Sequence, residues 1–204
     1  MKLALATKNK GKVRELSELL TPHDIEVVSL NDFPGIEDIE ESGETFRENA
    51  VIKALKVCEQ TGLMTLADDS GLEVDYLDGA PGIHSARFAG EEKDELANNK
   101  KLLKSLEGVP EDRRTARFQC IMAVATPDGW VYTAEGTCEG VIAGETRGDG
   151  GFGYDPLFYL PEYGKTFAEL DREVKNKISH RARALNNVLE ILADLKVMED
   201  TDWE

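Results

Sequence analysis

The first third of the chain combines short apolar runs with segments of helical periodicity. Lys2–Ala6 and Ile25–Leu30 are apolar runs typical of buried strands, whereas Gly11–Leu20 repeats its apolar residues at helical spacing. Thr45–Gln60 opens with the Thr-x-x-Glu pattern of a capping box, which predicts a helix over that range. This order of strands and helices is typical of an α/β protein.

The middle and the end of the chain predict a different arrangement. Thr115–Thr126 and Trp130–Gly136 are strand-like runs joined by Pro-Asp-Gly, which indicates a hairpin, and Glu139–Ala143 continues the sheet. Glu92–Leu106 predicts a surface helix, and an amphipathic helix follows Ser179 as its N-cap. We therefore expect a sheet with both parallel and antiparallel strands.

Length, charge and cysteine content narrow the possibilities further. The 204 residues fit one domain, which we place over residues 1–195 with an acidic tail over 196–204. A net charge of −16 argues against broad electrostatic binding to nucleic acid or to a membrane surface. The three cysteines lack metal-binding spacing, and no apolar run has the length of a signal peptide or a membrane span, so we expect a cytoplasmic protein.

Two adjacent carboxylates, Asp68 and Asp69, end an apolar run and precede Ser70 and Gly71. This pattern predicts a buried strand that delivers carboxylates to the rim of a cleft and then turns at the glycine. Neighbouring strand residues point to opposite faces, so the two acids are expected to have different roles. The alternative is an Asx-type turn in which both carboxylates bond to nearby backbone N–H groups.

The polar loop Thr7–Lys12 joins the first predicted strand to the first predicted helix. A strand-to-helix loop of this kind presents backbone N–H groups and a helix N-terminus, which favour phosphate. The loop is not a Walker motif, because Val13 stands where that motif needs Ser or Thr. The alternative is a solvated basic helix start, although three lysines there oppose the helix dipole.

Glu41 and Lys53 flank the start of the second predicted helix. Glu41 lies in the acidic segment Asn31–Glu44, which also holds Glu37 and Asp38, and it is a candidate metal ligand, with a solvated acidic loop as the alternative. Lys53 lies on the second turn of the helix and is expected to point back toward the same place.

The glycine-rich run Gly148–Pro156 contains the letters of a dinucleotide fingerprint but is not followed by a helix, so we reject a Rossmann site. Its glycines instead indicate a backbone that closely approaches a ligand, with Phe152 or Tyr154 available to stack on a base. The alternative is an irregular loop whose aromatic side chain fills the core.

His180 and Arg181 lie in the first turn of the last predicted helix, where cations oppose the helix dipole. With Lys175 nearby in the sequence, they indicate that an anion or a polar base edge offsets this cost.

Together, these motifs resemble the inosine/xanthosine triphosphate pyrophosphatases over residues 2–195. Six segments carry the resemblance and occur in this order: Thr7-x-Asn9-x-x-Lys12, Thr45-Phe46-x-Glu48-Asn49-Ala50, Ala67-Asp68-Asp69-Ser70-Gly71-Leu72, Ala80-Pro81-Gly82-Ile83-x-Ser85-Ala86-Arg87, Gly150-Gly151-Phe152-Gly153-Tyr154-Asp155-Pro156 and Ile178-Ser179-His180-Arg181.

The resemblance implies an ITPase-like (Maf/Ham-type) α/β fold: an elongated mixed sheet with flanking helices and two lobes around a central cleft. It implies hydrolysis of non-standard purine nucleoside triphosphates (ITP, dITP, XTP) to monophosphate and pyrophosphate, which removes deaminated purines from the nucleotide pool. It further implies a homodimer that depends on Mg2+, with Mn2+ as a possible substitute.

The resemblance also implies residue roles. Asp69 is expected to be the general base and a metal ligand, with Asp68 and Glu41 as further metal ligands. The expected phosphate-binding residues are Thr7, Lys8, Asn9, Lys10, Gly11, Lys12, Lys53 and Lys175. The expected sugar- and base-binding residues are Ser70, Phe152, Gly153, Tyr154, Asp155, His180 and Arg181.

Three other functions compete with this one. A Maf-like nucleotide pyrophosphatase is disfavoured by the His180-Arg181 pair and the Phe152–Pro156 loop. A nucleotide-sensing protein without turnover remains open. A nucleic-acid-binding module is disfavoured by the net charge of −16 and by the lack of a long basic stripe.

Overall fold

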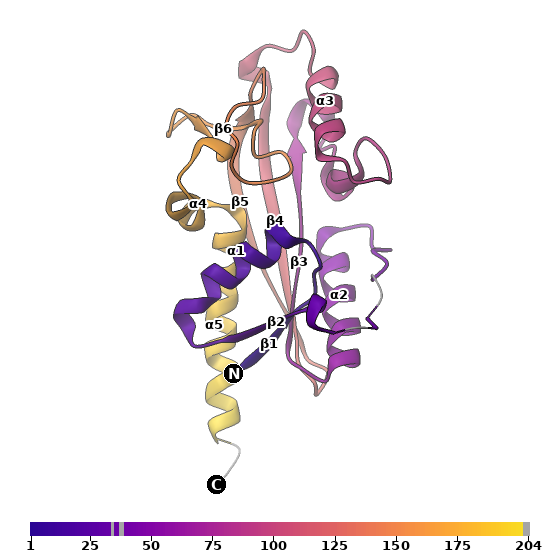
Figure 1. The fold of residues 1–204 in the computed structure, drawn as a ribbon, viewed down its shortest axis with the longest axis vertical. Coiled ribbons are helices and arrows are strands. Elements are labelled where there is room, and N and C mark those ends of the chain that lie inside the picture. Colours follow the sequence, from indigo (N-terminus) through magenta and orange to yellow (C-terminus); the bar gives the residue numbers. More distant parts are fainter. Residues whose placement is uncertain (34, 37–38, 202–204) are drawn as a thin grey trace. The chain divides into compact units, whose positions relative to one another are not determined.

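The structure, a computed structural model, describes residues 1–33, 35–36 and 39–201, and the predicted acidic residues Glu37 and Asp38 lie outside this range. Within these described residues, seven strands form one sheet in the order β2-β1-β3-β4-β5-β6-β7. The strands are β1 (Lys2–Leu5), β2 (Glu26–Ser29), β3 (Thr65–Val74), β4 (Thr115–Ala125), β5 (Val131–Ile142), β6 (Phe158–Leu160) and β7 (Lys165–Thr166). The α-helices are α1 (Lys10–Leu20), α2 (Phe46–Thr61), α3 (Glu95–Ser105), α4 (Arg172–Ile178) and α5 (His180–Thr201) (Figure 1).

The chain divides into two compact units. The first unit comprises Met1–Asp69, Cys120–Gly136 and Arg181–Glu204, and the second comprises Ser70–Gln119 and Thr137–His180. Strands β3, β4 and β5 therefore each contribute residues to both units. The mixed sheet with flanking helices confirms the predicted fold class.

The parallel part of the sheet lies in the first unit. β1 pairs with β2 through Lys2↔Glu26 and with β3 through Ala4↔Thr65. The two ends of the chain meet in one core, because Leu3 of β1 and Val188 of α5 belong to the same buried cluster (indigo and yellow in Figure 1). The acidic tail continues α5 as far as Thr201, and residues 202–204 lie outside the described range.

The second unit holds the short antiparallel strands and an aromatic core. β5 pairs with β6 through Val141↔Tyr159, and β6 pairs with β7 through Leu160↔Lys165. In the core, the ring centroid of Phe158 lies 4.7 Å from that of Phe118 and 4.9 Å from that of Phe167. Leu102 of α3 is fully buried in the same cluster.

Several local predictions are confirmed. Thr45 caps α2, and its capping box with Glu48 is complete. β4 and β5 form the predicted hairpin, in which Thr126 N–H donates to the Trp130 carbonyl oxygen at 2.9 Å. All three cysteines are buried, and none of the described helices has the length and apolar character needed to cross a membrane.

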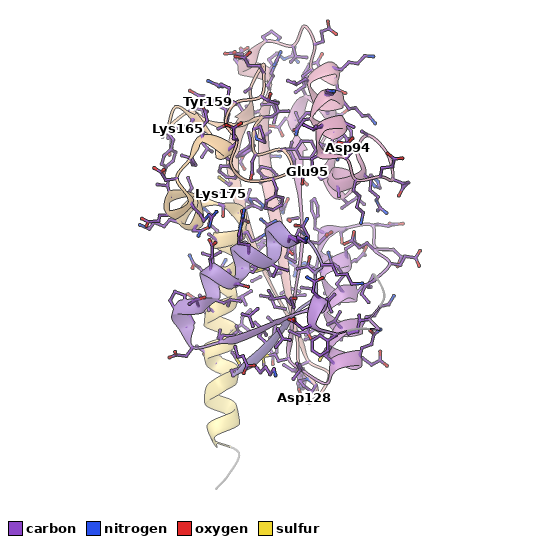
Figure 2. All side chains as sticks on the ribbon, in the orientation of Figure 1. Asp94, Glu95, Asp128, Tyr159, Lys165 and Lys175 are labelled. Carbon is purple, nitrogen blue, oxygen red and sulfur yellow. The ribbon has the colours of Figure 1, made fainter. Side chains whose placement is uncertain are left out.

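Two local predictions are wrong. The chain does not turn at Ser70-Gly71, because β3 continues without a break to Val74, and its pairing in the sheet overrides the local turn signal of glycine. Helix α3 begins at Glu95 rather than Glu92, since Asp94 caps it with bonds from two backbone N–H groups (Asp94 and Glu95 are labelled in Figure 2).

Candidate active site

The adjacent carboxylates Asp68 and Asp69 point to different partners, as strand alternation predicts. In the first unit, Asp68 Oδ2 accepts from Lys12 Nζ at 2.9 Å and lies 3.4 Å from Arg181 Nε. Asp69 Oδ1 accepts from Lys53 Nζ at 2.9 Å. Asp69 Oδ2 accepts no hydrogen bond from any residue that the structure describes.

Lys53 connects three oxygens. Its Nζ donates to Glu41 Oε1 at 2.8 Å, to Asp69 Oδ1 at 2.9 Å and to the Asp68 carbonyl oxygen at 2.7 Å. The predicted direction of Lys53 is therefore confirmed. Burial opposes the charged form of this lysine, but the carboxylates of Asp69, Glu41 and Asp68 together raise its pKa, so it remains an ammonium ion.

The two neighbouring acids have pKa shifts of opposite sign. Burial raises the pKa of Asp69, although Lys53 and Lys12 oppose this effect. Burial also opposes the ionised form of Asp68, but Lys12 and Arg181 hold its pKa far below the usual aspartate range. Asp68 is therefore a permanently ionised partner for two cations, whereas Asp69 is the more basic carboxylate.

The start of α2 holds the backbone next to Glu41. Asn49 Oδ1 accepts from Gly43 N–H at 2.8 Å, and Glu48 Oε2 accepts from Glu44 N–H at 2.7 Å. Gly43 has no room for a side chain, because a Cβ there would lie 2.7 Å from the Glu48 Cβ. The segment after Glu41 is therefore fixed on the same helix that carries Lys53.

Arg181 is held by carboxylates rather than exposed at its helix start. Its side chain is 3% exposed, and Nη1 donates to Glu15 Oε2 at 2.6 Å. Glu15 was not identified in the sequence, since its partner lies 166 residues away. The anion expected near Arg181 is thus supplied, at least in part, by Glu15 and Asp68 of the same unit.

The Thr7–Lys12 loop is built around Asn9. Asn9 Oδ1 caps α1 by accepting from Gly11 N–H at 2.9 Å and Lys12 N–H at 3.1 Å. Lys8 Nζ donates to the Ile36 carbonyl oxygen at 2.9 Å, and Lys10 is exposed. Lys12 Nζ forms an ion pair with Asp68, so the presence of one of the three lysines is explained without a bound phosphate.

In the second unit, Asp155 organises the glycine-rich loop. Its Oδ2 accepts from Phe152 N–H at 2.8 Å and from Lys175 Nζ at 2.6 Å (Lys175 is labelled in Figure 2). A Cβ on Gly151 would collide with the Asp155 carboxylate, so this glycine is required by close approach. Lys175 Nζ also lies 5.3 Å from the centroid of the Phe152 ring.

His180 and Tyr154 are largely buried in the second unit. The His180 ring is stacked on Phe118 at 4.6 Å with an interplanar angle of 11°. The Tyr154 hydroxyl donates to the Ser85 carbonyl oxygen at 2.8 Å, and burial raises its pKa. Ser70 is half-buried on β3, directly after Asp69.

The sequence interpretation also missed Asn99, on α3. Its carboxamide Nδ2 donates to the Gly153 carbonyl oxygen at 2.8 Å, and the residue is 5% exposed. Among the described residues, none donates to its buried Oδ1. A buried acceptor without a donor typically costs about 1–3 kcal/mol, so stability alone does not account for this asparagine. The position of Asn99 in the helical pattern did not mark it as a functional residue, because polar residues are common on α3.

The oxygen donors of this site suit a magnesium ion, with Asp69 and Glu41 as its protein ligands. Within the described part of the chain, no three His, Cys, Asp or Glu side chains gather as a metal-binding group. Asp69 and Glu41 nevertheless converge on Lys53 and supply hard oxygen donors. Mg2+ is commonly held by one or two carboxylates together with substrate phosphates, so these two residues fit it. Asp68 is already engaged by Lys12 and Arg181.

The whole chain was then compared with known proteins. The profile of the Ham1 family matches residues 3–191, which is most of the chain. The chain belongs to the Ham1 family. The Ham1 protein of Staphylococcus aureus has a solved structure that is similar with a TM-score of 0.84 and 39% identity, covering 95% of this chain and 99% of that one. A HAM1 protein from Coxiella burnetii has a solved structure that is similar with a TM-score of 0.85 and 42% identity, covering 95% of this chain and 99% of that one.

Relatives of this chain include proteins that are named dITP/XTP pyrophosphatase. The protein from Desulforamulus reducens is 62% identical over 200 residues, which covers 98% of this chain and 100% of that protein. The protein from Bacillus cereus is 54% identical over 190 residues, which covers 92% of this chain and 93% of that protein.

Proposed function

We propose that this protein hydrolyses non-standard purine nucleoside triphosphates, with dITP, ITP and XTP as substrates, to the monophosphate and pyrophosphate. Membership of the Ham1 family and the names of its close relatives support this activity. The observation that carries the proposal is the cluster of Asp69, Lys53 and Glu41, in which a buried carboxylate lies beside an ammonium group.

Asp69 is the general base in this proposal. Its Oδ1 is held by Lys53, which fixes the carboxylate, and its Oδ2 is the atom that takes the proton from the attacking water. Burial raises the pKa of Asp69, which makes the carboxylate a better proton acceptor than an exposed aspartate.

Mg2+ fits the oxygens of Asp69 and Glu41, and when bound it would neutralise phosphate charge in the transition state. Lys53 is close to both residues and contributes a further positive charge there. Phosphoryl transfer depends mainly on positioning and charge neutralisation, which this set of residues supplies. Asp68 is assigned a different role from the metal ligand first expected, since its charge holds Lys12 and Arg181.

The remaining substrate contacts are proposals from the resemblance. Thr7, Lys8, Asn9, Lys10, Gly11, Lys12 and Lys175 would bind the phosphates, and Ser70, Phe152, Gly153, Tyr154, Asp155, His180 and Arg181 would bind sugar and base. Support for the second group comes from the close approach of Gly151 to Asp155 and from the hydrogen bonds that Asp155 accepts from Phe152 N–H and Lys175 Nζ. A homodimer, a cytoplasmic location and the replacement of Mg2+ by Mn2+ also remain predictions from the resemblance.

The test is pyrophosphate release from dITP, ITP, XTP, dGTP, dATP and dTTP, with Mg2+ and with a chelator. We expect metal-dependent release that strongly favours dITP, ITP and XTP, and its loss in Asp69→Asn. Equal rates on all six would remove the base preference but keep the chemistry. Nucleotide binding without any release of pyrophosphate would instead support a nucleotide-sensing protein that does not turn over its ligand.

A further inference from the structure

The glycine-rich loop of the second unit is held by side chains from two directions. Asp155 binds Phe152 N–H at 2.8 Å, and the Tyr154 hydroxyl binds the Ser85 carbonyl oxygen at 2.8 Å. The peptide group between these points is that of Gly153 and Tyr154. Among the described residues, Asn99 is the hydrogen-bond donor to the Gly153 carbonyl oxygen, at 2.8 Å.

This peptide group lies in a turn that is closed by Asp155 N–H donating to the Phe152 carbonyl oxygen at 3.2 Å, and Asn99 adds a contact to it from outside the turn. Gly153 has φ +62°, in the left-handed region, and a Cβ there would meet nothing within 4 Å, so local packing does not restrict it. A trans peptide points its C=O and the following N–H in opposite directions. By holding the Gly153 carbonyl, Asn99 therefore also sets the direction of the Tyr154 N–H, which has no acceptor among the described residues.

The bonding of Asn99 differs from that of its neighbour Asn98. Both are buried, at 5% and 4% exposure, on the same helix. Asn98 uses both ends of its carboxamide, since Oδ1 accepts from Ala89 N–H at 2.6 Å and Nδ2 donates to the Ala86 carbonyl oxygen at 3.0 Å. Asn99 uses only Nδ2, and its buried Oδ1 has no donor among the described residues. The hydrogen bonds of Asn98 thus account for a buried asparagine at that position, whereas the single hydrogen bond of Asn99 leaves its buried Oδ1 unexplained by stability.

We propose that Asn99 is a positioning residue for base selection: through the Gly153 carbonyl, it fixes the Tyr154 N–H as a donor suited to a 6-oxo purine. This inference rests on the proposed function, because it takes the glycine-rich loop as the base-binding segment. A fixed N–H donor pairs with the 6-oxo oxygen of hypoxanthine or xanthine and leaves the 6-amino group of adenine without an acceptor.

The variants are Asn99→Leu, which keeps the size of the side chain and removes the amide, and Asn98→Leu as the matched control. The activity measurement is the ratio of kcat/KM for dITP to kcat/KM for dATP. We expect Asn99→Leu to lower this ratio by about fivefold or more while its melting temperature stays near that of the parent. We expect Asn98→Leu to lower the melting temperature and to leave the ratio unchanged.

A second measurement does not depend on turnover. Hydrogen exchange of the peptide covering residues 148–157, without nucleotide, is expected to be faster in Asn99→Leu than in the parent. Unchanged exchange would overturn the positioning role, even if the parent proved inactive on dITP and the proposed function failed. Faster exchange with an unchanged substrate ratio in an active enzyme would overturn the role in base selection. If Asn98→Leu does not fold, Leu96→Ala on the exposed side of α3 replaces it as the control, since Leu96 is 71% exposed.

Discussion

The neighbouring carboxylates of β3 provide the sharpest test of the structure, because Asp68→Asn should lower stability whereas Asp69→Asn should lower activity. The Asp68 side chain is fully buried, and the side chain of its partner Arg181 is only 3% exposed. Replacing Asp68 by Asn keeps the shape but removes one of the two carboxylates paired with Arg181, the other being that of Glu15. We therefore expect Asp68→Asn to lower the free energy of unfolding substantially.

The size of this loss follows from the burial of the partners. Removing one member of a buried ion pair typically costs about 3–5 kcal/mol, because an uncompensated charge remains inside the protein. Lys12 is a second cation paired with Asp68, since its Nζ lies 2.9 Å from Asp68 Oδ2 and its side chain is only 16% exposed. For a chain of this length, each kcal/mol of unfolding free energy corresponds to about 2–4 °C of melting temperature. We therefore expect Asp68→Asn to lower the melting temperature by roughly 6–20 °C.

Asp69→Asn is the matched control. A folded-state pKa above the unfolded value means that the ionised carboxylate is disfavoured in the folded protein at neutral pH, and Lys53 keeps Glu41 and the Asp68 carbonyl oxygen as partners, so the neutral replacement should destabilise the fold little. The same logic has the opposite sign for Asp68. Its depressed pKa gives stability that is present above the unfolded pKa of about 3.9 and is lost only as the pH falls through the lower folded value.

The assay is urea unfolding followed by far-UV circular dichroism at pH 7, with pyrophosphate release measured on the same samples. Asp68→Asn is expected to unfold at lower urea with an unchanged m-value, and Asp69→Asn to keep its midpoint while kcat falls by about 10²–10⁴-fold. The reasoning is refuted if Asp68→Asn stays within about 1 kcal/mol of the parent, or if the two variants lose stability equally.

Three further predictions address the active site. The pH profile of kcat/KM should show an acid limb at a pKa above the usual aspartate value, because burial raises the pKa of Asp69, and a limb at or below about 3.9 would contradict this. Gly151→Ala should abolish most activity, since its Cβ would collide with Asp155. Gly153→Ala has open space at φ +62° and should lose only about 1 kcal/mol of unfolding free energy. If activity and melting assays showed the same losses for both variants, the loop geometry would be contradicted. Removing divalent metal with a chelator should stop pyrophosphate release and adding Mg2+ should restore it, whereas full activity in the chelator would remove Mg2+ from the mechanism.

The sequence predicted those features that depend on residues close together in the chain. The capping box of Thr45, the hairpin at Thr126–Trp130 and the α1 loop are local, and propensity and spacing suffice for them. The direction of Lys53 was also accessible, because a helix of known start places its second turn reliably.

Features that depend on distant partners were not accessible. The continuation of β3 through Gly71 is set by strand pairing, which outweighs a local turn signal. Glu15 meets Arg181 across 166 residues, and Asn99 meets Gly153 across 54 residues. Periodicity identifies the buried face of a helix but not the polar group that a buried side chain will meet.

The shared core of β1 and α5 has a consequence for biosynthesis. Leu3 is synthesised long before Ala184, Leu185 and Val188, which share its cluster. The first unit thus remains without part of its apolar packing until α5 has been synthesised. The second unit ends at His180, so all of its residues are synthesised before α5 is finished. A nascent chain therefore holds an incomplete first unit until α5 follows, and a premature stop ahead of Arg181 removes both the packing of α5 and one of the two cations paired with Asp68.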